Sequence, residues 1–427
     1  MSENKIEITR TRVEAGLAKR YRKEAAFRFF GMLATAVGVI FLAVFFITLI
    51  AQGASAFQQN YITIDVEFSE ELLAPDGELD LEYADFDAVV RNAMKALFPE
   101  ATGRKDRREM MRLVSVGGAY QLRAMLKSDP GLLGTSQSVT VPASSNVDML
   151  LKGNIDRNVE ASRRPLTDKQ LAWIDQLVEN GRLEAKFNSA LFLNGDSREP
   201  ELAGIRGALM GSFYMLIVTI ALSFPIGAAA AIYLEEFAPK NRWADLIEVN
   251  INNLAAVPSI VFGLLGLAVF INWMSLPRSA PLVGGLVLSL MTLPVIIIAS
   301  RAAIKSVPPS IRDAALGLGA SRMQVVFHHV IPLALPGMLT GAIIGMGRAL
   351  GESAPLLMIG MVAFIVDVPA GFSDPSTALP VQVYLWADSP ERAFAERTAA
   401  AIIVLLGFLL LMNLSAVILR RRMEKKW

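Results

Sequence analysis

The sequence predicts an all-α polytopic membrane protein with six transmembrane helices, into which one α+β domain is inserted. Two observations favour this fold class. Of the 427 residues, 53% are hydrophobic and only 19% are charged, whereas ordinary soluble domains carry roughly 25% charged residues. The shortage of charge is also uneven, because long uncharged runs alternate with charged segments. This alternation is typical of a polytopic membrane protein with a soluble insert.

The composition also excludes several classes of function. The formal net charge is +1, so no overall field indicates nucleic-acid binding. The chain has no cysteine, which excludes disulfides, thiolate zinc sites and cysteine nucleophiles but does not fix the redox compartment. No G-x-x-x-x-G-K-[ST] pattern occurs, so the chain does not bind ATP through a P-loop. We expect no catalytic residue, no bound cofactor and no metal ion in this chain.

The first apolar run follows a basic N-terminal segment. Residues 1–28 contain eight Lys or Arg, and we expect this segment to be cytoplasmic. The uncharged run Phe29–Ala51 has about 23 residues, and at ~1.5 Å per residue it can cross a ~30 Å hydrocarbon core. We therefore place the first transmembrane helix at residues 29–53. Ala54-Ser55-Ala56 imitates a signal-peptidase site, but the run exceeds the about 7–15 apolar residues of a signal peptide. We interpret it as a retained anchor.

Residues 54–204 are predicted to form an α+β domain outside the membrane. About 145 residues of mixed charge suffice to bury a core. The predicted elements are a strand at Tyr61–Val66 and helices at Asp85–Phe98, Arg107–Leu126 and from Thr167 to Gly181. The strand alternates apolar and polar residues, Pro99 ends the first helix, and Thr167 with Gln170 forms a capping box. No nucleophile, metal or phosphate-loop pattern stands out, which favours a docking or spacer module.

Five further apolar runs bring the predicted number of spans to six. They lie at about Ala208–Tyr233, Leu254–Trp273, Leu282–Ser300, Gly337–Val366 and Thr398–Leu419. They form a predicted transmembrane core of five helices at residues 205–422, followed by a cytoplasmic tail at 423–427. Lys and Arg in short loops mark the cytoplasmic side. If the N-terminus is cytoplasmic, that side collects Lys240, Arg242, Arg301, Lys305, Arg312, Arg322 and the basic tail. The inserted domain is then periplasmic.

The loop at residues 301–336 contains a recurring transport motif. Asp313-Ala314-Ala315, then Gly319, then Ile331-Pro332 resembles the coupling loop of the membrane subunits of ABC importers, the EAA loop. Small side chains let a short helix sit close in a partner's cleft. An acidic residue near the start of that helix suits its N-terminus. Asp313 replaces the usual Glu. A coupling loop without a nucleotide site implies a separate ATPase subunit.

The rest of this loop carries prolines and histidines. Pro332 and Pro336 are expected to break helical structure before the next span. His329 stands where an aliphatic residue is common in the family. His328 and His329 are adjacent, so on a helix they would not face one ligand. We expect both to be loop residues, not metal ligands.

An arginine and a glutamate interrupt the fifth run. Each charge at mid-membrane depth costs roughly 2.5–3.5 kcal/mol. Gly341, Gly345, Arg348 and Glu352 share one helical stripe by spacing, and its glycines allow a neighbouring helix to approach closely. Pro355 is expected to bend the helix beside the pair. Arginine donors fit a tetrahedral oxyanion, so we predict that Arg348 and Glu352 line a substrate path. The alternative is an ion pair that only fixes helix packing.

Three further stretches identify a family. They are Val257–Leu264, Thr292–Arg301 and Leu379–Ala387. Together with Gly347–Pro355 they resemble the permease A subunit (PstA) of the phosphate-specific ABC importer, over about residues 205–422. The outer insert is similar to the extra N-terminal domain of longer members. Pro258 and Pro294 free backbone groups within spans, which a helix bundle tolerates beside a path or a neighbour. Both could equally be simple kinks.

The resemblance implies a type I permease fold and an assembly in the bacterial inner membrane. The implied partners are a C-type permease subunit, a dimeric ATPase holding ATP and magnesium, and a periplasmic phosphate-binding protein. Nucleotide-driven movement of the coupling loop would switch the pore between inward-facing and outward-facing states. Three alternatives remain: a secondary transporter, for which Glu352 would be the only coupling carboxylate; a membrane sensor; and an ABC permease for sulfate, molybdate or phosphonate.

Overall fold

The computed structural model describes residues 3–74 and 79–423. The chain divides into two compact units, residues 1–52 and 53–427. The first unit holds helix α1 (Glu3–Gly53) except its last residue, Gly53, which belongs to the second unit. This helix contains the predicted run 29–51 and is long and apolar enough to cross a membrane. Residues 424–427 of the predicted tail lie outside the described residues.

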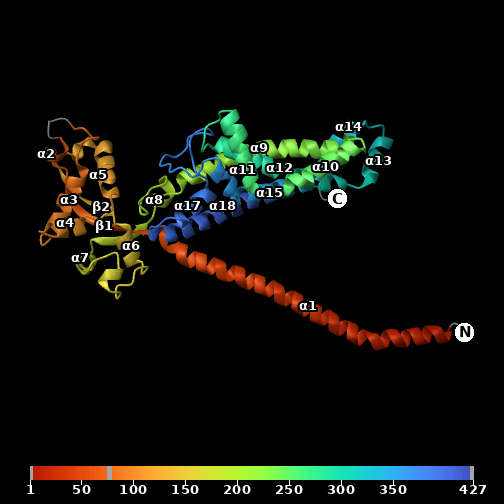
Figure 1. Cartoon of the computed structure of the whole chain (residues 1–427), viewed down its shortest axis with the longest axis horizontal. Coiled ribbons are helices and arrows are strands. Elements are labelled where there is room, and N and C mark those ends of the chain that lie inside the picture. Colours follow the sequence, from red (N-terminus) through yellow and green to blue (C-terminus); the bar gives the residue numbers. More distant parts are fainter. Residues whose placement is uncertain (1–2, 75–78, 424–427) are drawn as a thin grey trace. The chain divides into compact units, whose positions relative to one another are not determined.

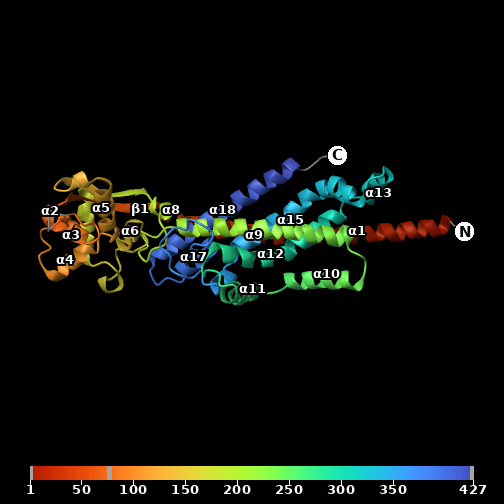
Figure 2. The same ribbon diagram turned by 90° about the horizontal axis from the view of Figure 1, so that it is seen from above.

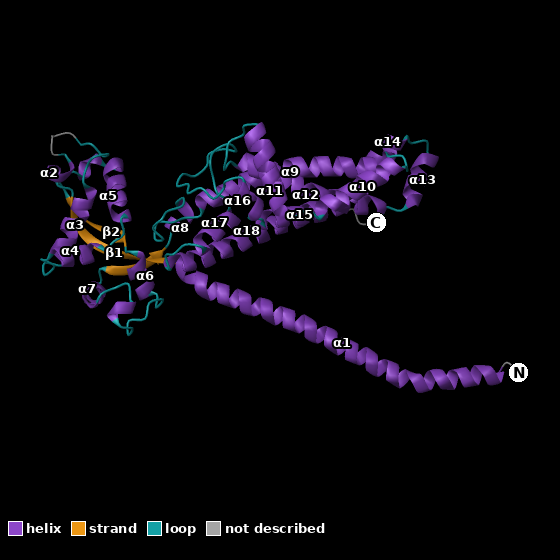
Figure 3. Ribbon diagram, viewed as in Figure 1, coloured by secondary structure: helices purple, strands orange, loops and turns teal. Residues whose placement is uncertain are grey.

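The second unit begins with the insert domain, residues 54–204, which is built on a three-stranded antiparallel sheet in the order β2-β1-β3 (Figure 3). The strands are β1 (Gln58–Glu67), β2 (Ser136–Pro142) and β3 (Leu183–Phe187). Alternate residues of the central strand β1 are fully buried, namely Ile62, Ile64 and Val66. The strand predicted from alternation is therefore confirmed.

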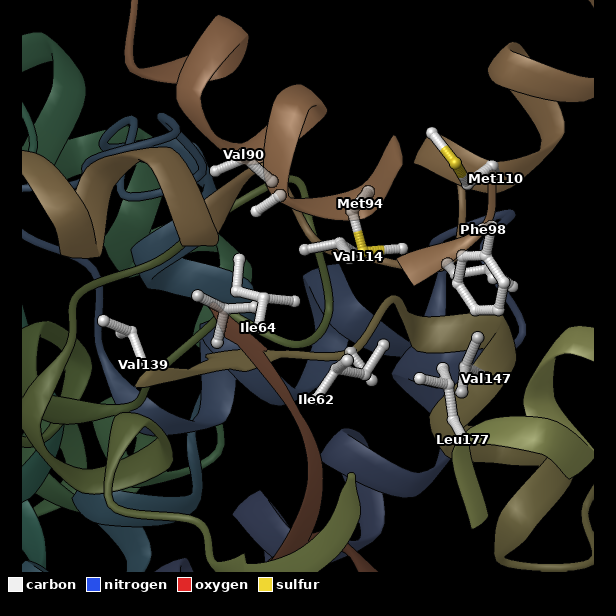
Figure 4. Close-up of a cluster of buried hydrophobic side chains, with 14 of the residues drawn as sticks. Ile62, Ile64, Val90, Met94, Phe98, Met110, Val114, Val139, Val147 and Leu177 are labelled. Atoms are coloured by element: carbon white, nitrogen blue, oxygen red, sulfur yellow. The ribbon is translucent and has the colours of Figure 1, made fainter. Parts of the chain in front are cut away.

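Short helices cover this sheet. They are α2 (Glu70–Leu73), α3 (Phe86–Leu97), α4 (Arg104–Met111), α5 (Gly117–Ser128), α6 (Ser145–Leu151), α7 (Asp168–Glu179) and α8 (Ala190–Leu193). Figure 4 shows how Met94 and Phe98 of the α3 region and Leu177 of α7 gather around Ile62 and Ile64 of β1. Full burial of each such side chain stabilises the fold by about 1.5–3 kcal/mol. The insert domain thus has a core of its own.

Local signals set the helix ends in this domain. Asp85 caps α3, because its carboxylate accepts a hydrogen bond from the Ala88 amide at 2.8 Å. Thr167 and Gln170 form the predicted capping box of α7, and Gly181 follows that helix with a positive φ of 64°. The predicted helix at 107–126 is wrong. The buried Val114 leaves the helix to bridge Ala143, which separates α4 from α5.

The permease core follows as a set of long and short helices. They are α9 (Arg206–Ile232), α10 (Arg242–Ala255), α11 (Ser259–Leu265), α12 (Pro281–Lys305), α13 (Pro309–Gly317), α14 (Arg322–Gln324), α15 (Ile331–Gly351), α16 (Ala354–Met358), α17 (Leu379–Ala387) and α18 (Ala393–Met423). Three π-helical stretches adjoin them: Tyr233–Phe237, Gly266–Trp273 and Val325–Val330. Helix α12 packs along both α9 and α15 (Figures 1 and 2).

Five of the described helices are long and apolar enough to cross a membrane, and six if one bent pair is a single span. The bent pair is α10 with Ser259–Trp273, which meet at 102°. The predicted run 254–273 is therefore not one straight helix. Pro258 precedes α11 as its N-cap, because its ring cannot continue a helix and it has no amide proton to donate. Pro294, in contrast, lies inside the continuous helix α12.

The predicted fifth span also differs. The run 337–366 is not one helix, because α15 starts earlier, at Ile331, and ends at Gly351. A short helix and a loop occupy the rest of the run. Hydropathy reports only that these residues are apolar. The end of the helix depends instead on the backbone at Glu352, which is extended with ψ 124°.

Candidate functional site

The loop that carries the coupling motif forms two helical turns joined by a glycine. We call residues 306–324 the coupling segment. Pro308 and Pro309 start α13, since a proline at the first helical position needs no amide partner. Gly319 adopts a φ of 87° after the helix ends, a left-handed conformation that glycine takes at little cost. Ser321 and Gln324 then form a capping box that starts α14.

The motif residues divide between two faces of the coupling segment. Asp313, Ala314 and Gly319 are exposed, while Ala315 is only 5% exposed and packs in a cluster with Val307 and Val325. Three of the predicted contact residues are thus open to a partner, and one belongs to the chain's own core. Asp313 is not in the first turn of α13, so the expected interaction with the helix N-terminus is wrong.

Arg312 holds the coupling segment against the end of α12 and the stretch after α9, and Arg301 ties that stretch and α10 to α12. Arg312 donates to the Glu236 carboxylate at 2.8 Å and to the backbone carbonyls of Val307 at 2.7 Å and Ile304 at 3.0 Å. Arg301 of α12 pairs with Glu235, and with Glu248 of α10 at 2.7 Å.

We call Arg301, Arg312, Glu235, Glu236 and Glu248 the arginine clamp. Both Glu235 and Glu236 belong to the π-helical stretch that follows α9. Sequence reasoning used the arginines only as markers of sidedness and did not find the clamp. The available signal was the pair of adjacent glutamates directly after an apolar run.

The residues leading into α15 are helical. His328 and His329 lie exposed in the π-helical stretch Val325–Val330, so the loop prediction is wrong. Pro332 occupies the first turn of α15, and Pro336 lies inside it. Neither ends the helix, although each lacks an amide proton to donate to the preceding turn. Within residues 3–74 and 79–423, no three His, Asp or Glu side chains are grouped so that they could hold a metal ion.

Arg348 and Glu352 form an ion pair at the end of α15. The Arg348 Nε and the Glu352 Oε1 are 3.5 Å apart, and the side chains are 43% and 21% exposed. The pair does not lie within a continuous span as the sequence predicted, because Glu352 caps the helix. Pro355 sits in the first turn of α16 and so does not bend α15. The Arg348 side chain is thus partly open at the surface of this chain.

The glycines of the same helix face a different neighbour. Gly341 packs against Ala299 of α12, where an added Cβ would lie 2.4 Å from the Ala299 Cβ. Gly345 faces Ile296 and Thr292 of α12 with ordinary contact distances of 3.6 Å. The glycine face of α15 is thus buried within this chain, while Arg348 is left open.

A second charged cluster joins the insert domain to α18. Lys152 Nζ lies 2.7 Å from both Asp148 and Glu396, and all three side chains are 8% exposed. Asn154 donates to Glu396 at 3.2 Å, and Asn60 donates to Asp148 through its backbone and side-chain nitrogens at 2.9 Å. We call these five residues the seam network.

Two charged residues near the start of α18 are buried. Glu396 belongs to the seam network, and Arg397 is 3% exposed and donates to Gln59 at 3.4 Å. Nearby, burial raises the pKa of Glu201 above its ordinary value of 4.5. Burial likewise raises the pKa of Asp196, which accepts a hydrogen bond from the Trp386 indole at 2.9 Å.

Two parts of the chain match known protein families. Residues 223–425 match the family described as binding-protein-dependent transport system inner membrane component, and residues 14–161 match a domain of unknown function, DUF3333. The chain contains an ABC-importer permease domain. The expected fold class, a polytopic permease with an inserted α+β domain, is confirmed. So is the resemblance to PstA proteins in a form with an added N-terminal domain.

The relatives cover different parts of this permease-containing chain. The probable ABC transporter permease protein YqgI of Bacillus subtilis is 40% identical over 36% of this chain and 52% of YqgI, so the chain spans about half the length of that relative. The phosphate transport system permease protein PstA 1 of Mycobacterium tuberculosis is 29% identical over 53% of this chain and 73% of the relative. An inward-facing structure of the MetNI methionine ABC transporter is 19% identical with a TM-score of 0.40, and covers 50% of this chain and 95% of that chain.

Proposed function

We propose that this chain is the membrane-spanning permease subunit of an ATP-driven importer of inorganic phosphate. The observation that carries the proposal is the half-exposed Arg348 beside Glu352 at the end of an apolar helix. Its planar fork of donors matches the oxygens of a tetrahedral anion. The PstA relatives, at 28–29% identity, support phosphate as that anion.

The pair suits a path completed by a second subunit. Arg348 is partly open at the surface of this chain, so a neighbouring C-type permease would close the path on the other side. Arg348 would contact the passing anion, and Glu352 would orient the arginine or accept a hydrogen bond from a protonated phosphate. A loose contact of 3.5 Å leaves the guanidinium able to exchange its partner.

The energy source is proposed to lie in another subunit. The exposed Asp313, Ala314 and Gly319 of the coupling segment would dock on a dimeric ATPase that holds ATP and magnesium. Both termini and the coupling segment would be cytoplasmic, and the insert domain would face a periplasmic phosphate-binding protein or the partner permease. Nucleotide binding would then switch the path between two states.

Uptake of radiolabelled phosphate into vesicles that contain the reconstituted complex tests this function. We expect Arg348→Lys and Glu352→Gln each to reduce uptake at least about tenfold, the size of one lost charge-assisted contact of about 1.5–3 kcal/mol. Assembly should be normal. Arg157→Lys is the matched control, because Arg157 pairs with Asp175 at 2.7 Å on the exposed surface of the insert domain.

The alternatives give different results in the same assay. Competition by excess sulfate would indicate an importer of another oxyanion. Full-rate uptake without the ATPase would indicate a secondary transporter. Unchanged uptake in both variants would mean that the pair only packs α15.

To test the insert domain, residues 58–187 are replaced by a short linker. The two ends are adjacent, because the Asn188 amide donates to the Phe57 carbonyl at 2.8 Å. If the domain receives the binding protein, half-maximal uptake will need more of that protein. An unchanged requirement would show that the domain is dispensable for delivery.

A further inference from the structure

Three phenylalanine rings are stacked on the surface of the insert domain where it joins the permease core. Phe57 and Phe192 have ring centroids 5.9 Å apart and planes inclined by 15°, and Phe187 and Phe192 are also 5.9 Å apart at 5°. Phe187 is 65% exposed, Phe192 36% and Leu193 60%. We call these four residues the aromatic patch. So much exposed apolar surface in one place marks a contact with something apolar.

Backbone contacts fix the aromatic patch in place. Gln58 pairs with Phe187 across β1 and β3. The fully buried Asn188 donates its backbone amide to the Phe57 carbonyl and its side-chain amide to the Ala56 carbonyl, both at 2.8 Å. Strand β3 and helix α8 are therefore held beside the short turn Ala54–Phe57. The patch is a rigid surface and not a mobile loop.

The depth of the aromatic patch relative to the membrane follows from the length of α18. Gly53 packs against that helix, where an added Cβ would lie 2.9 Å from backbone atoms of both Ala399 and Ala400. The basic end of α18 begins at Arg420, about 20 residues after Ala400. At ~1.5 Å per residue this is ~30 Å, the thickness of the hydrocarbon core. If Arg420 lies at one face of the membrane, Gly53 lies at the other.

Phe57 therefore lies just outside the hydrocarbon. It follows Gly53 by four residues in a 3₁₀ turn, which rises ~2.0 Å per residue and so at most about 8 Å. The layer of lipid headgroups on each side is about 5–8 Å thick. The aromatic patch is thus at the depth where aromatic side chains concentrate in membrane proteins.

Aromatic residues also lie near both ends of helix α9. Near its start, Phe213 and Tyr214 cluster with Phe372, with centroid distances of 6.0 Å and 5.1 Å. At its far end, Tyr233 is 55% exposed. Phe213 and Tyr233 are about 20 residues apart, which is again ~30 Å along a helix. Aromatic residues therefore bracket this span at both interfaces.

We propose that the aromatic patch is inserted into the lipid headgroup layer and anchors the insert domain to the membrane surface. Its occupant is lipid, because the patch continues the outer ends of the spans at the depth of the headgroups. This role depends on the spans and not on the transported ion, so it can fail while the proposed function holds.

Site-directed spin labelling tests the anchor directly, because the chain has no native cysteine. Single variants Phe187→Cys, Tyr83→Cys and Leu410→Cys are labelled with a nitroxide in the full chain in phosphatidylglycerol-containing vesicles. Tyr83 is 86% exposed in the insert domain and serves as the aqueous control, and Leu410 is 66% exposed in the middle of α18 and serves as the lipid control. Collision rates with oxygen and with a soluble nickel chelate report the depth of each label.

We expect the ratio of oxygen to nickel collision rates for the Phe187→Cys label to be at least about twice that for the Tyr83→Cys label. The ratio should remain below that for the Leu410→Cys label. A nickel collision rate equal to that of Tyr83→Cys would overturn the proposal. So would a label that neither reagent reaches once the partner permease is present, since protein would then cover the patch. Phe187→Trp, which keeps an aromatic ring in the stack, gives a second reading. Lipids brominated next to the headgroup should quench its added fluorescence, and absence of quenching would likewise reject the anchor.

Discussion

Lys152 shows how one side chain can hold two parts of a chain together. It pairs with two carboxylates, Asp148 from its own helix and Glu396 from α18, in a place where all three are almost fully buried. A buried pair of opposite charges contributes little compared with an apolar pair, but removal of one partner leaves an uncompensated charge. The seam network is therefore sensitive to single substitutions.

We expect Lys152→Met to lower the free energy of unfolding of the solubilised full chain by about 3–5 kcal/mol. Two carboxylates would remain buried with only Arg397 as a nearby cation. Thermal or denaturant unfolding followed by circular dichroism measures this loss. Arg157→Met, which breaks the exposed pair with Asp175, should cost less than about 1 kcal/mol. Equal losses in the two variants would contradict the role of the seam network.

Glu201 makes stability depend on pH. Burial raises its pKa, while the nearby Arg397 acts to lower it and Glu199 to raise it. The folded chain thus holds this proton more tightly than the unfolded chain. Stability then falls as pH rises from the ordinary pKa of 4.5 through the raised pKa of the folded chain. Glu201→Gln removes this penalty.

We expect the melting temperature of Glu201→Gln, relative to the unsubstituted chain, to rise as pH increases from 4 to 8. Scanning calorimetry at each pH provides the measurement. Glu199→Gln is the control, because Glu199 is an exposed carboxylate two residues away. If the difference in melting temperature between the Glu201→Gln and unsubstituted chains stays constant across this range, burial does not raise the pKa of Glu201.

The contact between α15 and α12 depends on glycine at one position and not at the next. An added Cβ at Gly341 would collide with Ala299, while one at Gly345 has room. We expect Gly341→Ala to destabilise the chain by about 1–3 kcal/mol. Gly345→Ala should be neutral or stabilising by up to about 1 kcal/mol, since alanine favours a helix over glycine. Thermal unfolding of the two solubilised variants compares them, and similar values would rule out this packing.

Sequence reasoning located the helices of the permease core well and their interruptions poorly. A run of apolar residues is visible in any window, so the spans and the strand at β1 were predictable. The break at Pro258 and the end of α15 at Gly351 were not, because both sit inside runs that are uniformly apolar. Local hydropathy does not report backbone geometry.

The charged sites were harder to predict for a different reason. Arg348 stood out because it interrupts an apolar run. Glu396 and Arg397 stand at the edge of one, where charges are normally solvated, and only the packing of the insert domain buries them. The arginine clamp likewise joins residues more than 50 positions apart in sequence. Contacts of this kind depend on the tertiary fold.

The arginine clamp connects the proposed ATPase contact to the helices that would move. Arg312 lies in the coupling segment next to Asp313, and its carboxylate partner Glu236 continues α9. A displacement of α13 would therefore be transmitted to α9 and α12 together. Loss of the Arg312–Glu236 pair would therefore uncouple transport from ATP hydrolysis.

We expect Glu236→Gln to lower phosphate uptake per ATP hydrolysed at least about fivefold in the reconstituted complex, with the ATPase rate retained. The exchange Glu236→Arg with Arg312→Glu should recover part of the ratio, since it restores the opposite charges. Parallel measurement of phosphate release and uptake gives the ratio. A fall in both activities together would point to misfolding, and an unchanged ratio would dismiss the clamp as a transmission element.

The π-helical stretch Val325–Val330 has one more consequence. A π turn holds an extra residue compared with an α turn, so this helix stores a spare position between the coupling segment and α15. Deleting that position would let the helix close as an ordinary α-helix. Because the wide turn already absorbs the extra residue, the helix on either side would keep its facing. A codon lost from α15 itself would instead turn everything before it by about 100° around the helix axis, the angle subtended by one residue.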